Sequence, residues 1–126
     1  MRILKYLALP ALLVVGCSED STDVTAPIKP LVAPSDLVVT RTGLTAVRLT
    51  WSDNNSSEES FAIERKQNNG EFLPRLFVTL NSTSARDTLG LFVDTTYTYR
   101  IRALRYFDEP SPYSNTATIF LTPFFP

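Results

Sequence analysis

The side chain with the clearest chemical potential in this sequence is Cys17, the only cysteine among 126 residues. It follows an apolar run over residues 6–15, which is preceded by the basic residues Arg2 and Lys5. A basic start, a short apolar centre and a small residue before the cut, here Gly16, form the layout of a secretory signal peptide. The run is roughly half as long as the apolar stretch that a membrane-spanning helix needs. We therefore expect residues 1–16 to be removed and Cys17 to begin the mature chain.

The residues around the expected cut, Leu13-Val14-Val15-Gly16-Cys17, resemble the bacterial lipoprotein signal. The resemblance implies a diacylglycerol in thioether linkage on the Cys17 sulfur and an acyl group on its amine. Each buried methylene adds about 0.8 kcal/mol, so several chains anchor a protein stably where one chain does so only marginally. Ser18 follows the cysteine, which resembles the class of lipoproteins sorted to the outer membrane. We expect a lipid-anchored protein of the bacterial cell envelope; the alternative is an unmodified thiol at an ordinary cleavage site.

The composition excludes several classes of function. The chain has 12 basic and 13 acidic residues, and without the two basic residues of the leader the balance is 10 against 13, or a net charge of −3. Nucleic-acid binding normally requires a clustered basic surface, so we expect no nucleic-acid partner. There is no histidine, and the one cysteine is assigned to lipid. We therefore expect no disulfide, no metal site and no cofactor.

The segment that follows the cysteine has the composition of a linker. Residues 18–34 are rich in Ser, Thr, Asp and Pro, contain Pro27, Pro30 and Pro34, and have no glycine or aromatic residue. Recurring proline favours extended polyproline geometry at about 3.1 Å per residue, which gives a reach of about 50 Å. We assign 17–34 to the lipidated cysteine and its tether, 35–122 to a single domain, expected to be monomeric, and 123–126 to a C-terminal tail.

From Asp36 onward, apolar and polar residues alternate with a period of two, which is the pattern of half-buried β-strands. Turn-forming clusters separate the runs at 53–57, 68–70, 81–82, 90 and 108–112. About seven short strands at this spacing predict an all-β antiparallel sandwich with one face of each sheet turned inward. The alternating positions are Leu37 and Val39; Val47, Leu49 and Trp51; Phe61 and Ile63; Phe77; Tyr97, Tyr99, Ile101 and Ala103; and Ala117, Ile119 and Leu121.

Five segments of this domain resemble bacterial fibronectin type III domains: residues 34–37, 49–54, 61–65, 95–103 and 111–115. The resemblance implies a seven-stranded, immunoglobulin-like antiparallel β-sandwich. It also implies that Trp51 is the core tryptophan and that Tyr97 is a corner tyrosine, whose hydroxyl bonds nearby backbone while Leu91 packs beneath it. The chain departs from the family habit in the loop before the last strand, which is longer and carries Tyr106 and Phe107 where small residues are usual.

That loop supplies the candidate binding residues, which are Tyr106, Phe107, Asp108, Glu109 and Tyr113. Exposed aromatic rings there would form a stacking platform for sugars or a hot spot for a protein partner. The alternative, which we favour because aromatic caps are commoner in small cores, is that the rings fold back and cap the end of the sandwich. In the implied topology the tether joins the same end of the domain as this loop, and the C-terminus lies at the opposite end.

Two further groups of residues carry alternatives. Glu64, Lys66, Thr98, Arg100 and Arg102 are expected on the outward faces of two neighbouring strands, as a solvated face with cross-strand charge pairs or, alternatively, as an anion-binding patch. Phe124 and Phe125 follow the last strand, where they either pack on the distal end of the sandwich or dock a partner.

The function expected from these features is that of a non-catalytic envelope lipoprotein. Its fibronectin type III module would serve as a spacer or would bind a protein or polysaccharide. Catalysis is disfavoured because histidine, the commonest general base, is absent and no motif places two carboxylates at glycosidase spacing. The alternative function is that of an accessory, or a truncated membrane-proximal part, of a larger secreted hydrolase or adhesin system.

Overall fold

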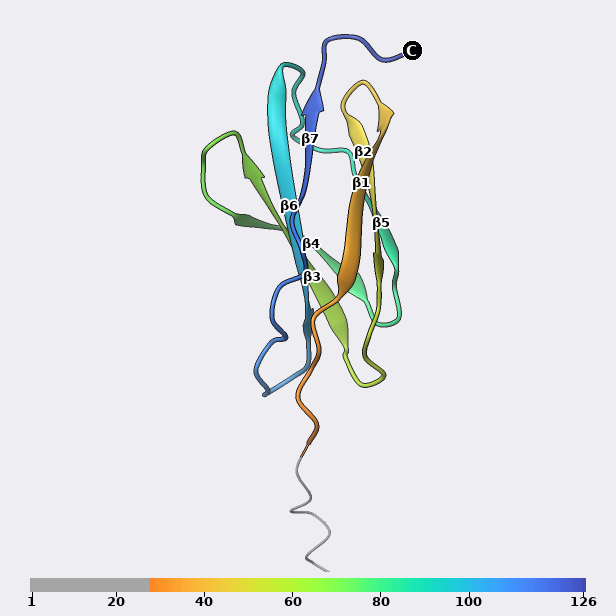
Figure 1. Ribbon diagram of the computed structural model, residues 1–126, viewed down its shortest axis with the longest axis vertical. Helices are drawn as coiled ribbons and strands as arrows, with labels where there is room; N and C mark the ends of the chain where they lie inside the picture. The colour runs from red at the N-terminus through yellow and green to blue at the C-terminus, as the bar shows by residue number, and fades with distance from the viewer. Residues whose placement is uncertain (1–27) are drawn as a thin grey trace, which may run out of the picture.

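The computed structural model describes residues 28–126, which form a two-layered β-sandwich (Figure 1). The expected signal peptide 1–16, the expected lipidation site Cys17 and the tether up to residue 27 lie outside the described residues. In the part of the chain that is described, no helix is long and apolar enough to cross a membrane.

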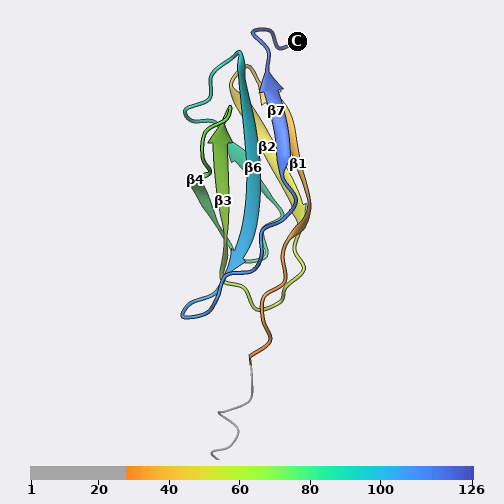
Figure 2. The ribbon, with the colours of Figure 1, turned by 60° about the vertical axis from the view of Figure 1, so that its left-hand side comes forward.

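Seven antiparallel strands build the two sheets, so the predicted fold class is confirmed. The three-stranded sheet has the order β1-β2-β5 and consists of β1 (Ser35–Gly43), β2 (Ala46–Ser52) and β5 (Ser84–Asp87). The four-stranded sheet has the order β4-β3-β6-β7 and consists of β4 (Leu73–Thr79), β3 (Ser60–Gln67), β6 (Thr95–Leu104) and β7 (Ala117–Leu121). Figure 2 shows β3, β6 and β7 in front of β1 and β2.

The core lies between the sheets and consists mainly of the alternating residues of β2, β3 and β6. Trp51 is buried and meets the ring of Phe61 edge-on, with ring centroids 5.7 Å apart and planes at 61°. Such T-shaped pairs place the positive ring edge of one partner against the negative face of the other. The fully buried side chains include Tyr97, Tyr99, Phe61, Leu49, Ile63, Ile101, Leu121 and Val47.

Phe77 is the one predicted inward position that the structure turns to the outside, with 68% of its surface exposed. Its neighbours Leu76 and Val78 pack against the core instead. Strand β4 is apolar on both faces, and the register of its pairing with β3 shifts between Ile63 and Glu64. Because a shift of one residue exchanges the two faces of a strand, the sequence alone supported either phase.

The loop before β6 has the geometry of a tyrosine corner. The backbone N–H of Phe92 donates a hydrogen bond of 2.8 Å to the hydroxyl of Tyr97, whose side chain is completely buried. Leu91 is buried beside it and belongs to the same core cluster. The loop is thereby tied to β6 through a core residue, and the polar end of that residue does not remain unpaired.

The N-terminal segment packs on the sandwich before β1 begins. Leu31 is buried in the core cluster, and Val32 exchanges two hydrogen bonds of 2.7 Å with the side chain of Asn55. Residues 29–34 were expected to belong to a free tether, but the structure holds them against the domain. As predicted, this segment leaves from the end that carries the loop between β6 and β7, and the C-terminus lies at the opposite end (Figure 1).

Candidate functional site

The end of the sandwich that carries the N-terminal segment 28–34 also carries an apolar groove, beside the loop between β6 and β7. The groove has a volume of about 520 Å³. Its lining is mainly apolar, with Leu80 from the loop after β4 and Leu104 from the end of β6. We call this feature the aromatic pole; its lining residues are Glu59, Ser60, Leu80, Leu104, Arg105, Tyr106 and Phe107.

The two aromatic rings of the pole point into solvent. Tyr106 is 76% exposed and Phe107 is fully exposed, with its backbone at φ 57° in the left-handed region. That region is uncommon for residues other than glycine, and it turns the chain sharply at the loop tip. The ring centroids lie 6.0 Å apart at an angle of 40°. The expectation that these aromatics cap the sandwich is therefore wrong, and the two rings form an exposed pair.

A network of charged and polar groups holds the loop in this shape. Arg105 forms an ion pair with Asp108 and donates further hydrogen bonds to Ser57 at 2.6 Å and to the carbonyl of Lys29 at 2.9 Å. The carboxylate of Glu59 accepts a hydrogen bond of 2.9 Å from the N–H of Tyr106. These bonds fix the loop between β6 and β7 to the segment before β3 and to the N-terminal segment. A loop that is already ordered loses less entropy when a ligand binds its rings.

The acidic residues predicted in this loop have different surroundings. The hydrogen bond from Arg105, helped by the N–H of Glu109, lowers the pKa of Asp108 below its ordinary value. Asp108 is thus occupied in holding the loop. Glu109 is exposed beside it, and its backbone N–H donates a hydrogen bond of 2.8 Å to Asp108. Glu109 belongs to the same loop but does not line the groove of the aromatic pole.

Tyr113 lies apart from the pole, on the outer face of the four-stranded sheet. Its hydroxyl donates a hydrogen bond of 2.8 Å to Glu64, which also binds Arg100 at 2.7 Å. Burial raises the pKa of Glu64, but the hydrogen bonds from Arg100 and Tyr113 outweigh it and leave that pKa below its ordinary value. Burial and the bond to Glu64 raise the pKa of Tyr113. The structure therefore does not bring Tyr113 together with Tyr106 and Phe107.

The charged face around Glu64 is less solvated than the sequence suggested. The Arg100 guanidinium lies 3.7 Å from the ring centroid of Tyr113 and 4.0 Å from that of Phe72. Arg102 also lies over Tyr113, at 4.7 Å. Cations in contact with aromatic faces gain about 0.5–2 kcal/mol each, depending on their desolvation. The arginines here are held by rings of the domain itself, and we assign this face a structural role.

A buried charge cluster that sequence reasoning missed joins the two sheets along their β4 and β5 edges. Asp87 is 1% exposed and accepts hydrogen bonds from Arg65 at 2.7 Å, Arg75 at 3.1 Å and the hydroxyl of Tyr99 at 2.8 Å. Burial, followed by the charge of Asp87, raises the pKa of Tyr99. One feature of the sequence could have indicated this cluster. Arg65 occupies the next inward position after Phe61 and Ile63, and a charged residue at an inward position requires a buried partner.

The opposite end of the sandwich holds the C-terminal tail through Arg41. This guanidinium donates hydrogen bonds to the carbonyls of Thr122 at 2.6 Å and Phe124 at 2.9 Å. It also lies 5.3 Å from the ring centroid of Phe125. Phe124 remains 79% exposed. The tail was expected either to pack on the distal end of the sandwich or to dock a partner. Its backbone packs on the distal end, while the ring of Phe124 is exposed.

Within residues 28–126, no three acidic, cysteine or histidine side chains come together in a way that would hold a metal ion. In comparisons with known proteins, no family model and no curated protein matched this chain. Solved structures did match, with low sequence identity and over most of the chain.

Three of these structures illustrate the likeness. Titin module A71 from human cardiac muscle aligns with a TM-score of 0.62 at 22% identity, over 75% of this chain and 95% of the module. A computationally redesigned β-sandwich protein aligns with a TM-score of 0.63 at 24% identity, over 76% and 95% of the two chains. Pectate lyase Pel3 from Pectobacterium carotovorum aligns with a TM-score of 0.58 at 14% identity, over 68% of this chain but only 26% of the lyase. The likeness shows that the fold is a fibronectin type III or immunoglobulin-like β-sandwich.

Proposed function

We propose that this chain is a non-catalytic, lipid-anchored module of the bacterial cell envelope. We propose further that its aromatic pole binds a protein or polysaccharide partner. The observation that carries the binding role is the fully exposed ring of Phe107 beside Tyr106 and an apolar groove of about 520 Å³. Exposed aromatic side chains on a rigid loop are costly to keep in water and are typical of interaction hot spots. The anchor rests on the sequence around Cys17, and the outer membrane is the proposed location.

The position of the pole relative to the tether favours a partner close to the membrane. The N-terminal segment leaves the domain from the end that carries the pole, and the Lys29 carbonyl is bonded to Arg105 of the same loop. Ten residues, 18–27, lie between Cys17 and Ile28, and the 11 steps from one to the other correspond to a reach of about 35 Å in extended geometry. The proposed partner is therefore within a few tens of ångströms of the bilayer, such as an envelope protein or a polymer of the adjacent wall.

The experiment compares the mature chain with the double variant Tyr106→Ala/Phe107→Ala in a glycan array and in pull-downs from envelope extracts. Phe92→Ala is the matched control, because this ring is also exposed, at 61%, but lies in the loop before β6. The proposal predicts a ligand that the mature chain and the Phe92→Ala variant retain and the double variant loses. A ligand retained by the double variant contradicts the role of the pole, and the absence of any ligand leaves the spacer function in its place.

A second candidate function is that of an accessory to a polysaccharide-degrading system. The likeness in fold to about a quarter of pectate lyase Pel3, whose chain is 26% covered, supports this alternative. A separate accessory would act in trans. Reconstitution with hydrolases from the same envelope would then raise the rate on an insoluble polysaccharide but not on a soluble one.

A further inference from the structure

A second cavity lies on the side of the sandwich, away from the aromatic pole. It has a volume of about 310 Å³ and borders strand β4 and the turn between β3 and β4. Figure 1 shows this turn in the half of the molecule opposite the N-terminal segment. Its lining residues are Arg65, Gln67, Gly70, Glu71, Leu73, Pro74 and Arg75. The cavity includes both arginines of the buried charge cluster.

The two arginines carry one positive charge more than their partner neutralises. Among residues 28–126, Asp87 is the single carboxylate that both guanidiniums contact, and their other bonds go to the neutral carbonyls of Leu89 and Gly90. Both Nη2 atoms also lie near one point, 3.4 and 3.9 Å from the position that a Cβ on Gly90 would take. Two cations held this close, with one anion between them, favour a second anion.

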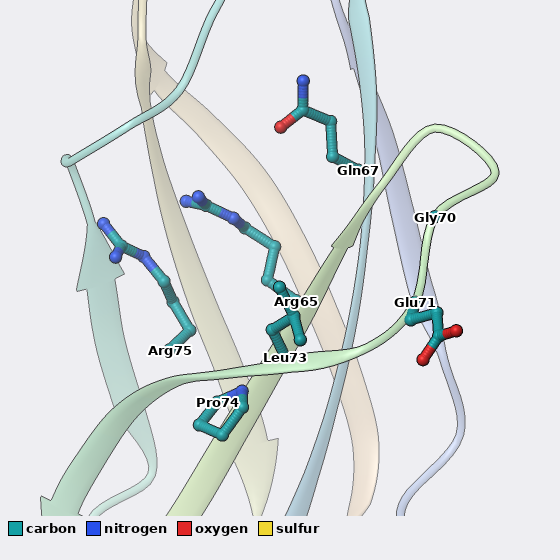
Figure 3. Close-up of a pocket in the computed structure, with 7 residues that line it drawn as sticks. All are labelled: Arg65, Gln67, Gly70, Glu71, Leu73, Pro74 and Arg75. Atoms are coloured by element: carbon teal, nitrogen blue, oxygen red, sulfur yellow. The ribbon is translucent and has the colours of Figure 1, made fainter.

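Both arginines also have N–H groups that make no hydrogen bond to any of the residues that the structure describes. A guanidinium has five N–H groups. Arg65 directs three of them to Asp87, Leu89 and Gly90, and Arg75 directs two to Asp87 and Leu89. Figure 3 shows the two heads on one side of the cavity, while the carboxylate of Glu71 points away from them. A guanidinium binds a carboxylate best, with two parallel N–H bonds to its two oxygens.

We infer that this cavity binds the carboxylate of a uronic acid residue in an acidic polysaccharide. Because the lining already includes the carboxylate of Glu71, a monoanion meets less charge repulsion in this cavity than a phosphate dianion would. Leu73 and Pro74 provide an apolar wall for the C–H face of a sugar ring, and Gln67 provides an amide for its hydroxyls. The volume lies at the lower end of the range for ligand pockets, about 300–1,000 Å³, and suits a single ring.

A peptide strand is a poorer occupant of this cavity. Peptides that bind a sheet edge add a hydrogen-bonded strand to it. Pro74 has no backbone N–H to donate at this point of β4, and the register of the strand shifts there. The cavity therefore lies where β4 is least able to pair with another strand. This cavity lies on a different surface from the aromatic pole, so a ligand can bind here independently of the pole.

The test is a titration of the full chain, in detergent micelles, with oligogalacturonate and with the neutral oligogalactose of the same length. Arg75→Gln removes a cavity cation while leaving the Arg65–Asp87 pair. Arg86→Gln is the matched control, since Arg86 is an exposed arginine of the adjacent strand β5. We expect the full chain and Arg86→Gln to bind the acidic oligomer equally, Arg75→Gln to bind it at least tenfold more weakly, and no variant to bind the neutral one.

Arginine side-chain N–H resonances give a second readout in the unmutated chain, which stands even if Arg75→Gln folds poorly. The signals of Arg65 and Arg75 are expected to shift on addition of oligogalacturonate, and those of Arg86 are not. Equal binding of the neutral oligomer, unshifted Arg65 and Arg75 signals, or full displacement by equimolar phosphate would overturn the inference. Loss of binding in Tyr106→Ala/Phe107→Ala with Arg75→Gln unaffected would assign the uronate to the aromatic pole and also overturn it.

Discussion

Removal of the Asp87 carboxylate is expected to destabilise the domain strongly. Asp87 is 1% exposed and accepts hydrogen bonds of 2.7, 3.1 and 2.8 Å from two guanidiniums and one phenol. Hydrogen bonds to a charged group contribute about 1.5–3 kcal/mol each, but the side chains of Arg65 and Arg75 are 14% and 24% exposed and regain water when their partner is lost. We therefore expect Asp87→Ala to cost about 3–5 kcal/mol, the range for breaking a buried charge pair.

The assay is equilibrium urea unfolding of Asp87→Ala and Tyr99→Phe. Tyr99→Phe removes one of the three donors and keeps both ion pairs, so its expected cost is about 1 kcal/mol. For a domain of this size, the loss in Asp87→Ala corresponds to a fall in Tm of roughly 15–30 °C. A cost for Asp87→Ala below about 1.5 kcal/mol, or a cost no larger than that of Tyr99→Phe, would refute the view that this cluster ties the sheets together.

Three further predictions concern the core, the charged face and the tail. Trp51→Ala or Tyr97→Ala is expected to cost about 3–5 kcal/mol for the lost aromatic volume, and a shift in chemical denaturation below a third of this would contradict the core assignment. Because the pKa of Glu64 is lowered in the folded state, its stabilisation is present above its ordinary value of 4.5 and is lost as the pH falls through the folded pKa. The stability difference from Glu64→Gln is thus expected to be about 1–2 kcal/mol at pH 7 and to shrink below pH 4.5, and a pH-independent difference would contradict the charged pair. Arg41→Ala is expected to release the tail and speed chymotrypsin cleavage at Phe124 severalfold without a change in Tm above a few degrees; unchanged cleavage would mean that other contacts hold the tail.

Alternation and turn residues were sufficient to predict the fold class, because strands with one buried face leave a period-two pattern. The exceptions have physical causes. Phe77 faces outward because β4 has apolar residues on both faces and a register shift beside Pro74 decides which of them points inward. Asp87 was not identified because a single acidic residue at a strand end has no periodic signal until its partners are known in space.

The candidate site was predictable only in part, because residue order gives neighbours in the chain but not the surface on which each side chain lies. Tyr106 and Phe107 are adjacent in the chain, so their pairing needed no knowledge of the fold, but their exposure depends on the left-handed backbone at Phe107. Tyr113 is only six positions further on, yet it lies on the sheet because Ser111 and Ser114 bond the backbone of β6 and hold this segment against it. Proximity in sequence therefore did not imply a shared surface.

The proposed placement of this module at a membrane depends on Cys17, and intact-mass spectrometry of the chain from its native membrane tests it most directly. We expect a polypeptide that begins at Cys17 and carries the mass of a diacylglyceryl group and an additional acyl chain. A chain with a free thiol at position 17, or one that retains residues 1–16, would contradict it.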